Sequence, residues 1–254
     1  MKILSWSFLL MTTSSQAAFA ELSNFSTDEN SLKLISQVKN REKSIIQYKP
    51  PKDGKKRIST NRGVDSRDCE GAIDNKILLL TPKEHIGYTL KERPTFLFYL
   101  SERPTQPVVF SLVIPSSRKT IGVTEIEVAS GINAVTLPQE IEGLKPGESY
   151  RWSVSIVCDE NRRDLDIYTD AWIEREAVSS VVEQQLQATK NNTERARILA
   201  LGSYWYDALE TLYRSPENED LFAELLETVG ISLPQPTTDR IGGLAAGVGS
   251  IRSN

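Results

Sequence analysis

The 254-residue chain has few of the residues on which metal centres and many catalytic sites depend. It contains one histidine and two cysteines, and no run of about 20 apolar residues such as a membrane-spanning helix needs. One cysteine pair supplies too few thiolates for a zinc site, and the formal net charge of -4 gives no overall attraction to nucleic acid. We therefore expect no metal, no cofactor, no nucleic-acid partner, and a soluble protein that does not span a membrane.

The first 20 residues have the pattern of a cleavable export signal. Lys2 precedes a short apolar stretch at residues 3–11, and Ala18-Phe19-Ala20 supplies the small-x-small site that signal peptidase accepts. The apolar stretch is too short to cross a bilayer. We predict cleavage before Glu21 and export to the periplasm or the extracellular space.

The two cysteines, Cys69 and Cys158, fit an exported protein. Disulfides persist in oxidising compartments, so we predict a bond between these two residues. In the chain-entropy model, closing a loop of about 90 residues stabilises the fold by roughly 4 kcal/mol.

Residues 21–66 have the composition of a tether. They contain few apolar residues in any period, and from Lys39 to Arg67 ten Lys or Arg residues stand against three Asp or Glu residues. Such a segment cannot bury enough apolar surface to fold, so we predict a disordered cationic arm. A solvated linker is the simpler interpretation, and electrostatic docking on an anionic wall polymer is the alternative.

Residues 67–176 change to short β-favouring runs separated by proline, glycine and polar clusters. Their number and spacing predict an antiparallel β-sandwich domain. The seven runs lie at residues 77–80, 95–100, 107–114, 121–128, 132–137, 149–158 and 165–174.

The run at residues 149–158 alternates with a period of two. Tyr150, Trp152 and Cys158 fall on one face, so we predict Tyr150 and Trp152 as structural core beside the disulfide. The preceding segment, Leu144-Lys-Pro-Gly-Glu-Ser-Tyr150, resembles the turn and tyrosine corner of fibronectin type III domains. The resemblance implies an immunoglobulin- or fibronectin-III-like sandwich.

Residues 177–232 switch to a helical period and predict a small helical appendage. One helix is expected at residues 177–190, and a second carries an apolar stripe from Ile198 to Leu212. A third is expected to begin after Ser215 and to stop at Gly230. Residues 233–254 are rich in glycine, alanine and serine and are predicted to be a disordered tail.

Four segments in order match one group of proteins. They are Gly87–Tyr99 (GYTLKERPTFLFY), Tyr150–Asp159 (YRWSVSIVCD), Asp170–Arg175 (DAWIER) and Trp205–Leu209 (WYDAL). With them the chain resembles the exported, mostly cyanobacterial family of domain of unknown function 928. The resemblance implies no catalytic residue. It implies an envelope or membrane-sensor protein as partner, since genes of the family often lie near those of membrane-bound sensors.

Two loops carry residues that are typical of catalytic or metal sites. His85 is the sole candidate base for a serine-based triad, but no Gly-x-Ser-x-Gly elbow accompanies it, so a surface loop residue is the better interpretation. The loop from Asp159 to Asp166 has enough oxygen ligands to suggest calcium, yet two arginines interrupt it and the required glycine is missing. We expect a solvated hairpin loop.

The run at residues 165–174 raises two further possibilities. Asp166, Asp170 and Glu174 share one face, as paired carboxylates for glycoside hydrolysis would require, although an ordinary exposed sheet face is the simpler interpretation. A second set, the aromatic rings of Tyr99, Tyr168 and Trp172, is a possible binding surface for stacking sugars, unless the helices cover it.

The sequence therefore predicts no catalytic constellation. Our leading hypothesis is a non-enzymatic periplasmic protein-interaction or adaptor module. A carbohydrate- or cell-wall-binding sandwich is the alternative, and a glycoside hydrolase-like enzyme is a remote one.

Overall fold

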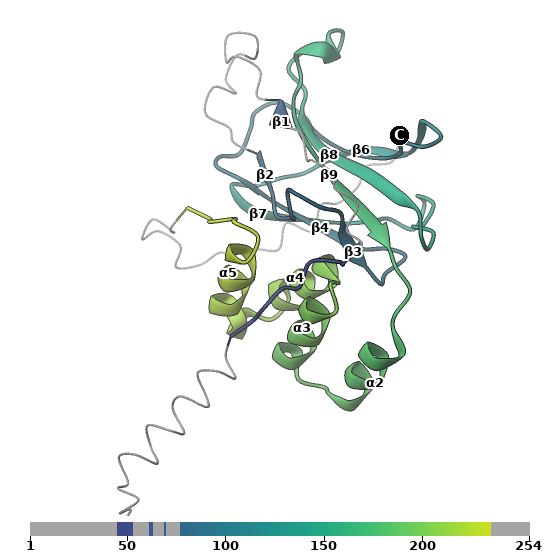
Figure 1. Ribbon diagram of the computed structural model, residues 1–254. Coiled ribbons are helices and arrows are strands. Elements are labelled where there is room, and N and C mark those ends of the chain that lie inside the picture. Colours follow the sequence, from purple (N-terminus) through teal and green to yellow (C-terminus); the bar gives the residue numbers. More distant parts are fainter. Residues whose placement is uncertain (1–44, 53–60, 63–68, 70–76, 235–254) are drawn as a thin grey trace, which may run out of the picture. The chain divides into compact units, whose positions relative to one another are not determined.

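The structure is a computed structural model that describes residues 45–52, 61–62, 69 and 77–234 (Figure 1). This described part is mainly β, with two sheets followed by four α-helices. The predicted export signal, most of the predicted arm and residues 235–254 of the predicted tail lie outside it.

The larger sheet has the strand order β1-β9-β8-β5-β6, and the short strand β3 pairs parallel to β9. Its remaining pairs are antiparallel. The bounds are β1 (Asn61–Arg62), β3 (Gly87–Thr89), β5 (Val108–Ile114), β6 (Lys119–Ile126), β8 (Ser149–Ile156) and β9 (Ile167–Arg175).

The smaller sheet consists of β2 (Ile77–Leu79), β4 (Thr95–Leu100) and β7 (Gly131–Thr136), in the order β2-β4-β7. Its central strand β4 is buried at all six positions. The expected runs at residues 77–80 and 95–100 thus become paired strands.

The core of the sandwich forms between the two sheets. Tyr150 and Trp152 of β8 are 1% and 0% exposed, as the period of two predicts. The Trp152 ring lies 5.0 Å from Phe96 of the smaller sheet, between ring centroids. The Tyr150 hydroxyl accepts a hydrogen bond from the backbone N–H of Lys145 (2.9 Å), so the corner tyrosine bonds the backbone upstream of it.

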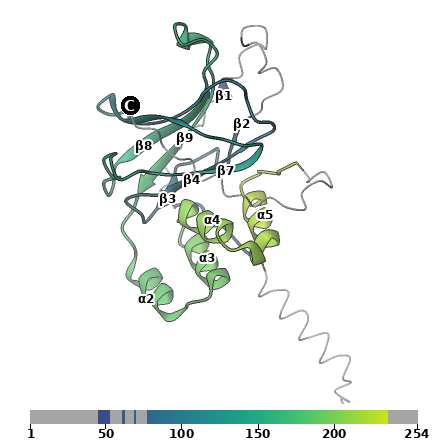
Figure 2. The same ribbon diagram turned by 180° about the vertical axis from the view of Figure 1, so that it is seen from behind.

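Four helices follow the sandwich and lie together on one side of it (Figures 1 and 2). They are α2 (Ser180–Ala188), α3 (Asn192–Leu201), α4 (Trp205–Tyr213) and α5 (Glu219–Glu227). A 3-10 turn at Pro216–Asn218 leads into α5. Among the described residues, no helix combines the length and the apolar character that crossing a membrane requires.

The predicted single stripe from Ile198 to Leu212 is divided between α3 and α4. The chain turns at Gly202 and Ser203, and Ser203 adopts a left-handed conformation with φ of 73°. The prediction of one helix was wrong because the spacing of apolar residues continues across the break and carries no sign of this turn.

The end of α5 follows the prediction. Gly230 has φ of 72°, its N–H donates to the carbonyl of Glu227 (2.9 Å), and the N–H of Ile231 donates to that of Leu226 (3.0 Å). These two bonds satisfy carbonyls that a helix end leaves open, and glycine adopts the required positive φ without strain.

Residues 45–52, which we call the strap, correct the prediction of a disordered arm. Ile46 is 1% exposed and Tyr48 is 8% exposed, and the N–H of Lys49 donates to the carbonyl of Ala200 (3.1 Å). The Tyr48 ring packs against Trp205, with ring centroids 4.9 Å apart. Two alternating apolar side chains therefore suffice to dock this short segment, although its composition is that of a linker.

Cys69 and Cys158 form a disulfide with a Cα–Cα distance of 5.0 Å and a sequence separation of 89 residues. Cys69 is 2% exposed, whereas Cys158 is half-buried. Strand β8 ends at Ile156 and Val157 is also buried, so the alternation along the strand does not continue to Cys158. The disulfide thus joins the segment before β2 to the end of the core strand.

Candidate functional site

Helix α4 joins the helices to the sandwich through its first two side chains. The indole nitrogen of Trp205 donates to the carbonyl of Leu80, which follows β2 (2.9 Å). The buried hydroxyl of Tyr206 lies 2.8 Å from Trp152 Nε1, from which it accepts, and 3.1 Å from the carbonyl of Trp172, to which it donates. Tyr206 therefore connects α4 to both β8 and β9.

The close approach of Tyr206 depends on a glycine in β3. A Cβ atom at Gly87 would lie 2.7 Å from Cε2 of the Tyr206 ring. Contacts this short do not occur between real atoms, so a larger residue would displace the ring. Gly87 is needed here for space.

Two buried carboxylates on α4 extend the same junction. Asp207 Oδ2 accepts from the backbone N–H of Leu90 (2.9 Å), and burial raises the pKa of Asp207 to about 6. Glu210 contacts Lys91 (2.7 Å) and Arg214 (2.8 Å). Burial opposes ionisation of Glu210, but the hydrogen bonds and charge of its cations prevail and hold its pKa below the usual range. Both acids are bound to groups of the protein, as structural carboxylates are.

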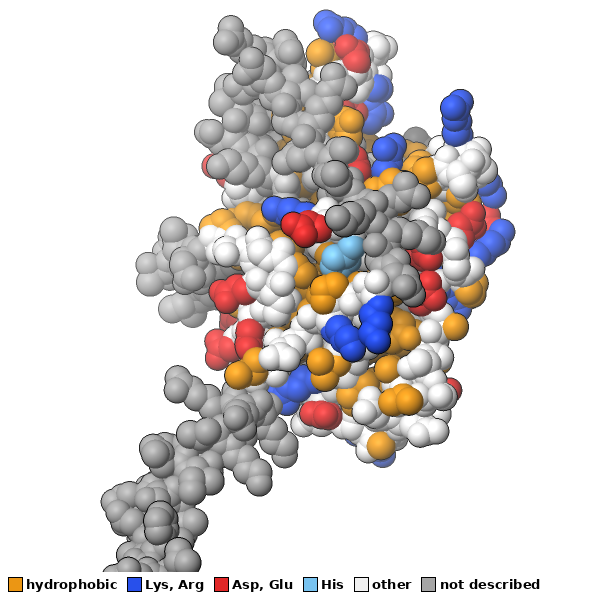
Figure 3. Space-filling model, viewed as in Figure 1, with side chains coloured by type: hydrophobic (Ala, Val, Ile, Leu, Met, Phe, Trp, Pro, Cys, Tyr) orange, Lys and Arg blue, Asp and Glu red, His pale blue; other side chains and the backbone are white. Residues whose placement is uncertain are grey.

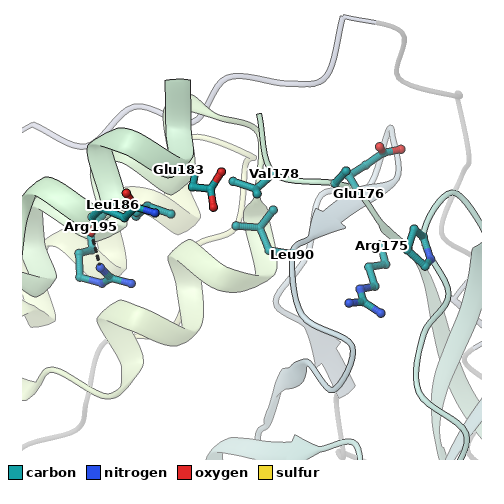
Figure 4. A pocket seen from close by; sticks show the side chains of 10 residues that line it. Leu90, Arg175, Glu176, Val178, Glu183, Leu186 and Arg195 are labelled. Atoms are coloured by element: carbon teal, nitrogen blue, oxygen red, sulfur yellow. Dashed lines mark hydrogen bonds between the residues drawn. The ribbon is translucent and has the colours of Figure 1, made fainter. Parts of the chain in front are cut away.

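A groove of about 610 Å³, which we call the α2 groove, opens beside this junction (Figure 4). Leu90, Val178 and Leu186 form its apolar floor. In Figure 4 Arg195 of α3 lies at one end of the floor and Arg175, at the end of β9, lies at the other. The remaining lining residues are Pro146, Glu176, Ala177, Glu183 and Gln187.

The two arginines of the α2 groove are fixed by backbone carbonyls. Arg195 Nη1 donates to Leu186 (2.9 Å), and Arg175 Nη1 donates to Leu144 (2.8 Å) and lies 3.7 Å from Glu92 Oε2. A guanidinium has five N–H donors in a rigid plane, so one nitrogen can be held while others remain directed elsewhere. The α2 groove thus places an apolar floor between two oriented cations.

The surface around α2 is also partly apolar. Val181 is 63% exposed, Val178 is 38% exposed, and Val182 is the one buried residue of α2. Figure 3 shows hydrophobic side chains at the surface of the helical region, with Lys and Arg side chains beside them. This helix therefore leaves apolar area open to a partner.

A second groove of about 430 Å³ lies next to the strap. Pro51 and Lys52 of the strap line it on one side, and Tyr88 of β3 and Tyr204 line it on another. Glu174 also reaches it, and the Ser149 hydroxyl donates a hydrogen bond to that carboxylate. Its mixed polar lining gives it less apolar surface to bury than the α2 groove.

The three rings predicted as a binding surface do not lie together. Tyr99 belongs to β4 of the smaller sheet and is 8% exposed, so it cannot form part of an exposed platform. Tyr168 and Trp172 both lie on β9 and are half-buried, and they share the face that turns away from the core residue Ala171. The three-ring platform is therefore corrected to a pair of rings on β9.

The acidic stripe that begins just before β9 and continues along it also differs from the expected exposed face. Asp166, Asp170 and Glu174 are 6%, 2% and 3% exposed. Successive members are four residues apart, which on a strand is about 13 Å between Cα atoms. The carboxyl groups of glycosidases lie roughly 5 to 9.5 Å apart, so this spacing does not favour a catalytic pair.

His85 and the loop after β8 have other local roles. His85 Nδ1 is hydrogen-bonded to the carbonyl of Ile86 (3.0 Å), and its ring stacks on Tyr48 of the strap at 5.7 Å between centroids. In the loop, Arg163 contacts the carboxylate of Asp166 (2.7 Å). No group of three or more His, Cys, Asp or Glu residues arranged to hold a metal ion occurs within the part of the chain that the structure describes.

Sequence reasoning did not find the α2 groove, because its lining comes from segments that are far apart along the chain. Leu90 follows β3, Pro146 precedes β8, Arg175 ends β9, and Arg195 belongs to α3. The sequence did hold one hint of apolar surface on this helix: the adjacent valines at residues 181 and 182. Adjacent residues of a helix point in different directions, so only one of these valines can face the buried side.

Comparison with protein families shows where the chain belongs. The family model described as Domain of Unknown Function (DUF928) matches residues 57–235, which include both sheets and all four helices. No curated protein matches the chain. Gly87, Trp152, Trp172 and Tyr206, one from each of the four segments that resemble the family, meet around the Tyr206 side chain. These segments therefore specify how the helices join the sandwich.

Proposed function

We propose that this chain, which belongs to the DUF928 family, is an exported, non-enzymatic adaptor module that binds a protein partner. The description of the family names no activity, so the proposal rests on the α2 groove. The partner is an envelope or membrane-sensor protein in the periplasm or the extracellular space. The export-signal pattern of residues 1–20 and the Cys69–Cys158 disulfide support this location.

The single observation that carries the proposal is the apolar floor of the α2 groove between Arg175 and Arg195. An apolar side chain of the partner gains free energy by covering Leu90 and Val178. Carboxylates on either side of that side chain match the two guanidinium groups. The partner segment is therefore an extended peptide with an apolar residue flanked by acidic residues.

Glu176 and Glu183 belong to the same lining and restrict the ligand further. In Figure 4 the Glu183 carboxylate lies beside Val178, on the side of Leu186 and Arg195, and the Glu176 carboxylate lies toward the Arg175 end. Each carboxylate therefore offsets part of the attraction that the arginine on its side exerts on an acidic ligand. This mixed charge disfavours a uniformly acidic segment.

Peptide display tests the proposal directly. Random peptides are selected on the purified, oxidised protein, and those retained are measured against Val178→Asp, which places a charge on the floor. Leu201→Asp is the matched control, because Leu201 is 54% exposed and does not line the groove. We expect acidic-apolar-acidic peptides whose affinity falls about tenfold or more in Val178→Asp, is kept in Leu201→Asp, and weakens with salt. Failure to enrich any peptide, or equal binding to Val178→Asp, contradicts the proposal.

A carbohydrate- or cell-wall-binding function is the second candidate. Tyr168 and Trp172 are half-buried on one face of β9, and Arg151 of β8 lies opposite Trp172. Aromatic rings beside polar groups suit sugar rings, which stack on them and bond at their edges. The anionic-polymer docking predicted for Lys39 to Arg67 would add to such binding, and most of that segment lies outside the described residues.

Co-sedimentation with peptidoglycan and with an acidic polysaccharide tests this second candidate. Trp172→Ala removes the ring and keeps the carbonyl that Tyr206 needs. Retention of the wild-type protein on either polymer and its loss in Trp172→Ala would favour the candidate. No co-sedimentation at low salt would remove it.

Two finer proposals rest on resemblance. We assign the sandwich to the immunoglobulin- or fibronectin-III-like type, supported by the Lys145 N–H to Tyr150 hydroxyl bond at the strand corner. The four family-like segments support a cyanobacterial source. A glycoside hydrolase-like activity finds no support in the spacing of Asp166, Asp170 and Glu174.

A further inference from the structure

The segment between β9 and α2, residues 176–179, separates the α2 groove from the second groove. Glu176 and Ala177 line both grooves. Val178 lines the α2 groove and not the second one, whereas Tyr204 lines the second groove and not the α2 groove. The segment therefore has one edge on the α2 groove and its opposite edge on the groove that contains Tyr204.

The Tyr204 hydroxyl fixes how the backbone of this segment is turned. It donates to the Ala177 carbonyl (3.0 Å) and accepts from the Ser179 N–H (3.3 Å). Ser179 is extended, with φ of -72° and ψ of 145°. In an extended chain the N–H and C=O of one residue point to one edge, and those of the next residue point to the other edge. The Val178 N–H and C=O therefore point away from Tyr204, toward the α2 groove.

Neither backbone group of Val178 has a hydrogen-bond partner within the described part of the chain. The pairing with β3 ends before it, with a bond from the Glu176 N–H to the Thr89 carbonyl (2.9 Å). The next backbone donor after β3, the Leu90 N–H, is bonded to Asp207 Oδ2 instead (2.9 Å). The ladder thus stops where the α2 groove begins, and it leaves one donor and one acceptor there that another strand can pair with.

A single residue of an extended peptide can satisfy both groups. In an antiparallel pair, two directly opposed residues can exchange both of their backbone hydrogen bonds, and their side chains lie on the same face. The Val178 side chain belongs to the floor of the α2 groove and lies next to Leu90 (Figure 4). The peptide residue opposite Val178 therefore places its own side chain on this floor, which suits an apolar residue.

We propose that the α2 groove binds an extended acidic-apolar-acidic partner segment by strand addition, in which the apolar residue exchanges two backbone hydrogen bonds with Val178. This inference rests on the proposed peptide-binding function and adds the mode of recognition. Backbone pairing supplies affinity whatever the sequence, while the floor and the two arginines select the side chains. The residues on either side of the apolar one turn their N–H and C=O away from Val178 and make no bond to it.

N-methylation of single peptide amides tests the pairing. The probe is the synthetic peptide acetyl-Glu-Ser-Leu-Ser-Glu-amide, with longer forms that have two or three serines on each side of the leucine, titrated calorimetrically into the purified, oxidised protein. N-methylation of the leucine removes the donor to the Val178 carbonyl, so the affinity should fall about tenfold or more. N-methylation of the serine that follows alters an amide on the outer edge, so the affinity should stay within about threefold.

Two proline variants test the same pairing from the side of the protein. Val178→Pro removes the N–H and keeps an apolar side chain, so it should weaken the unmethylated peptide about tenfold. Ala177→Pro is the matched control, because the Ala177 N–H points to the Tyr204 edge and has no partner among the described residues. This control should bind the peptide as the wild type does.

The outcomes separate the mode of recognition from the function itself. Binding that tolerates N-methylation of the leucine as well as that of the serine overturns strand addition and leaves the peptide-binding function in place. Equal losses at every amide overturn it too, because they indicate a helical ligand that needs all its internal bonds. If no peptide of the series binds to the wild type, the function and the strand addition fall together.

Discussion

The indole nitrogen of Trp152 and the hydroxyl of Tyr206 meet at 2.8 Å in the core, and this contact joins the central strand of the sandwich to helix α4. Tyr206 also donates to the Trp172 carbonyl and contacts Thr81 Oγ1 (3.1 Å). One hydroxyl thus satisfies groups from three separate segments in a place that water does not reach.

Replacing Tyr206 by phenylalanine should destabilise the protein by about 1 to 3 kcal/mol, because the buried Trp152 N–H and Trp172 carbonyl lose their partner. Urea denaturation measures the change. Tyr213→Phe is the matched control, since Tyr213 is half-buried at the other end of α4, and its effect should be below about 0.5 kcal/mol. Equal effects of the two variants would show that the Tyr206 hydroxyl is not central.

Asp207 should make stability fall as pH rises from about 4 to 6. Its pKa is about 6 in the folded protein, above the ordinary value of 3.8, so the folded state binds the proton more tightly than the unfolded state does. The stabilising protonated form is fully present below the unfolded pKa and is lost as pH passes the folded pKa. Two pKa units correspond to roughly 3 kcal/mol, which is an upper figure for a buried acid.

Asp207→Asn tests this dependence because the amide keeps an oxygen for the Leu90 N–H and does not titrate. The free energy of unfolding of wild type minus variant should decline between pH 4 and pH 6 and then level off. Glu210→Gln provides the comparison, since the pKa of Glu210 is lowered and its contribution disappears only as pH falls. A difference that is flat across this range contradicts the assignment.

The strap should contribute measurably to stability. Ile46→Ala removes a side chain that is 1% exposed and should cost about 2 to 4 kcal/mol through lost burial and a cavity. The adjacent Ile45 is 47% exposed, so Ile45→Ala makes the same chemical change at a solvated position and should cost well under about 1 kcal/mol. Thermal or urea unfolding of both variants gives the comparison, and similar losses would mean that the strap does not dock as described.

Removal of the disulfide should destabilise the fold by roughly 4 kcal/mol, the entropy of closing a loop of this length. The double variant Cys69→Ser/Cys158→Ser should therefore unfold at a lower urea concentration than the oxidised wild type. Wild type measured with a reductant should behave like the variant. A reductant that leaves the unfolding midpoint of wild type unchanged would contradict the expected contribution.

The sandwich was predictable where one strand carries its own signal. The alternation of Tyr150 and Trp152 along β8 reports which side is buried, and β4 is a nearly continuous apolar run with a proline on either side of it. Strand β3 escaped prediction because Gly87, Tyr88 and Thr89 are too few to show a period, and its parallel pairing with β9 exists only in the folded chain.

Features that depend on distant partners were not predictable. Ile46 and Tyr48 look like isolated apolar residues in a cationic linker, yet both are buried, and the Tyr48 ring packs against Trp205 and His85. The same limit applies to Asp170 and Glu174, whose period predicts a shared face but not its burial. The spacing of residues along one strand or helix shows which way their side chains point. Whether those side chains are buried depends on which other segments of the chain pack against them.

Helix α2 is attached to the protein much less firmly than α4. Val182 is its one buried residue, Leu186 packs partly buried against the core, and the Leu186 carbonyl accepts from Arg195 Nη1 (2.9 Å). Tyr204 secures the entrance to α2 by donating to the Ala177 carbonyl (3.0 Å). Helix α2 buries one residue where α4 buries seven, so displacing α2 would cost less packing energy than displacing α4. A bound ligand can therefore widen the α2 groove by displacing α2, so ligands of different size can bind between Arg175 and Arg195.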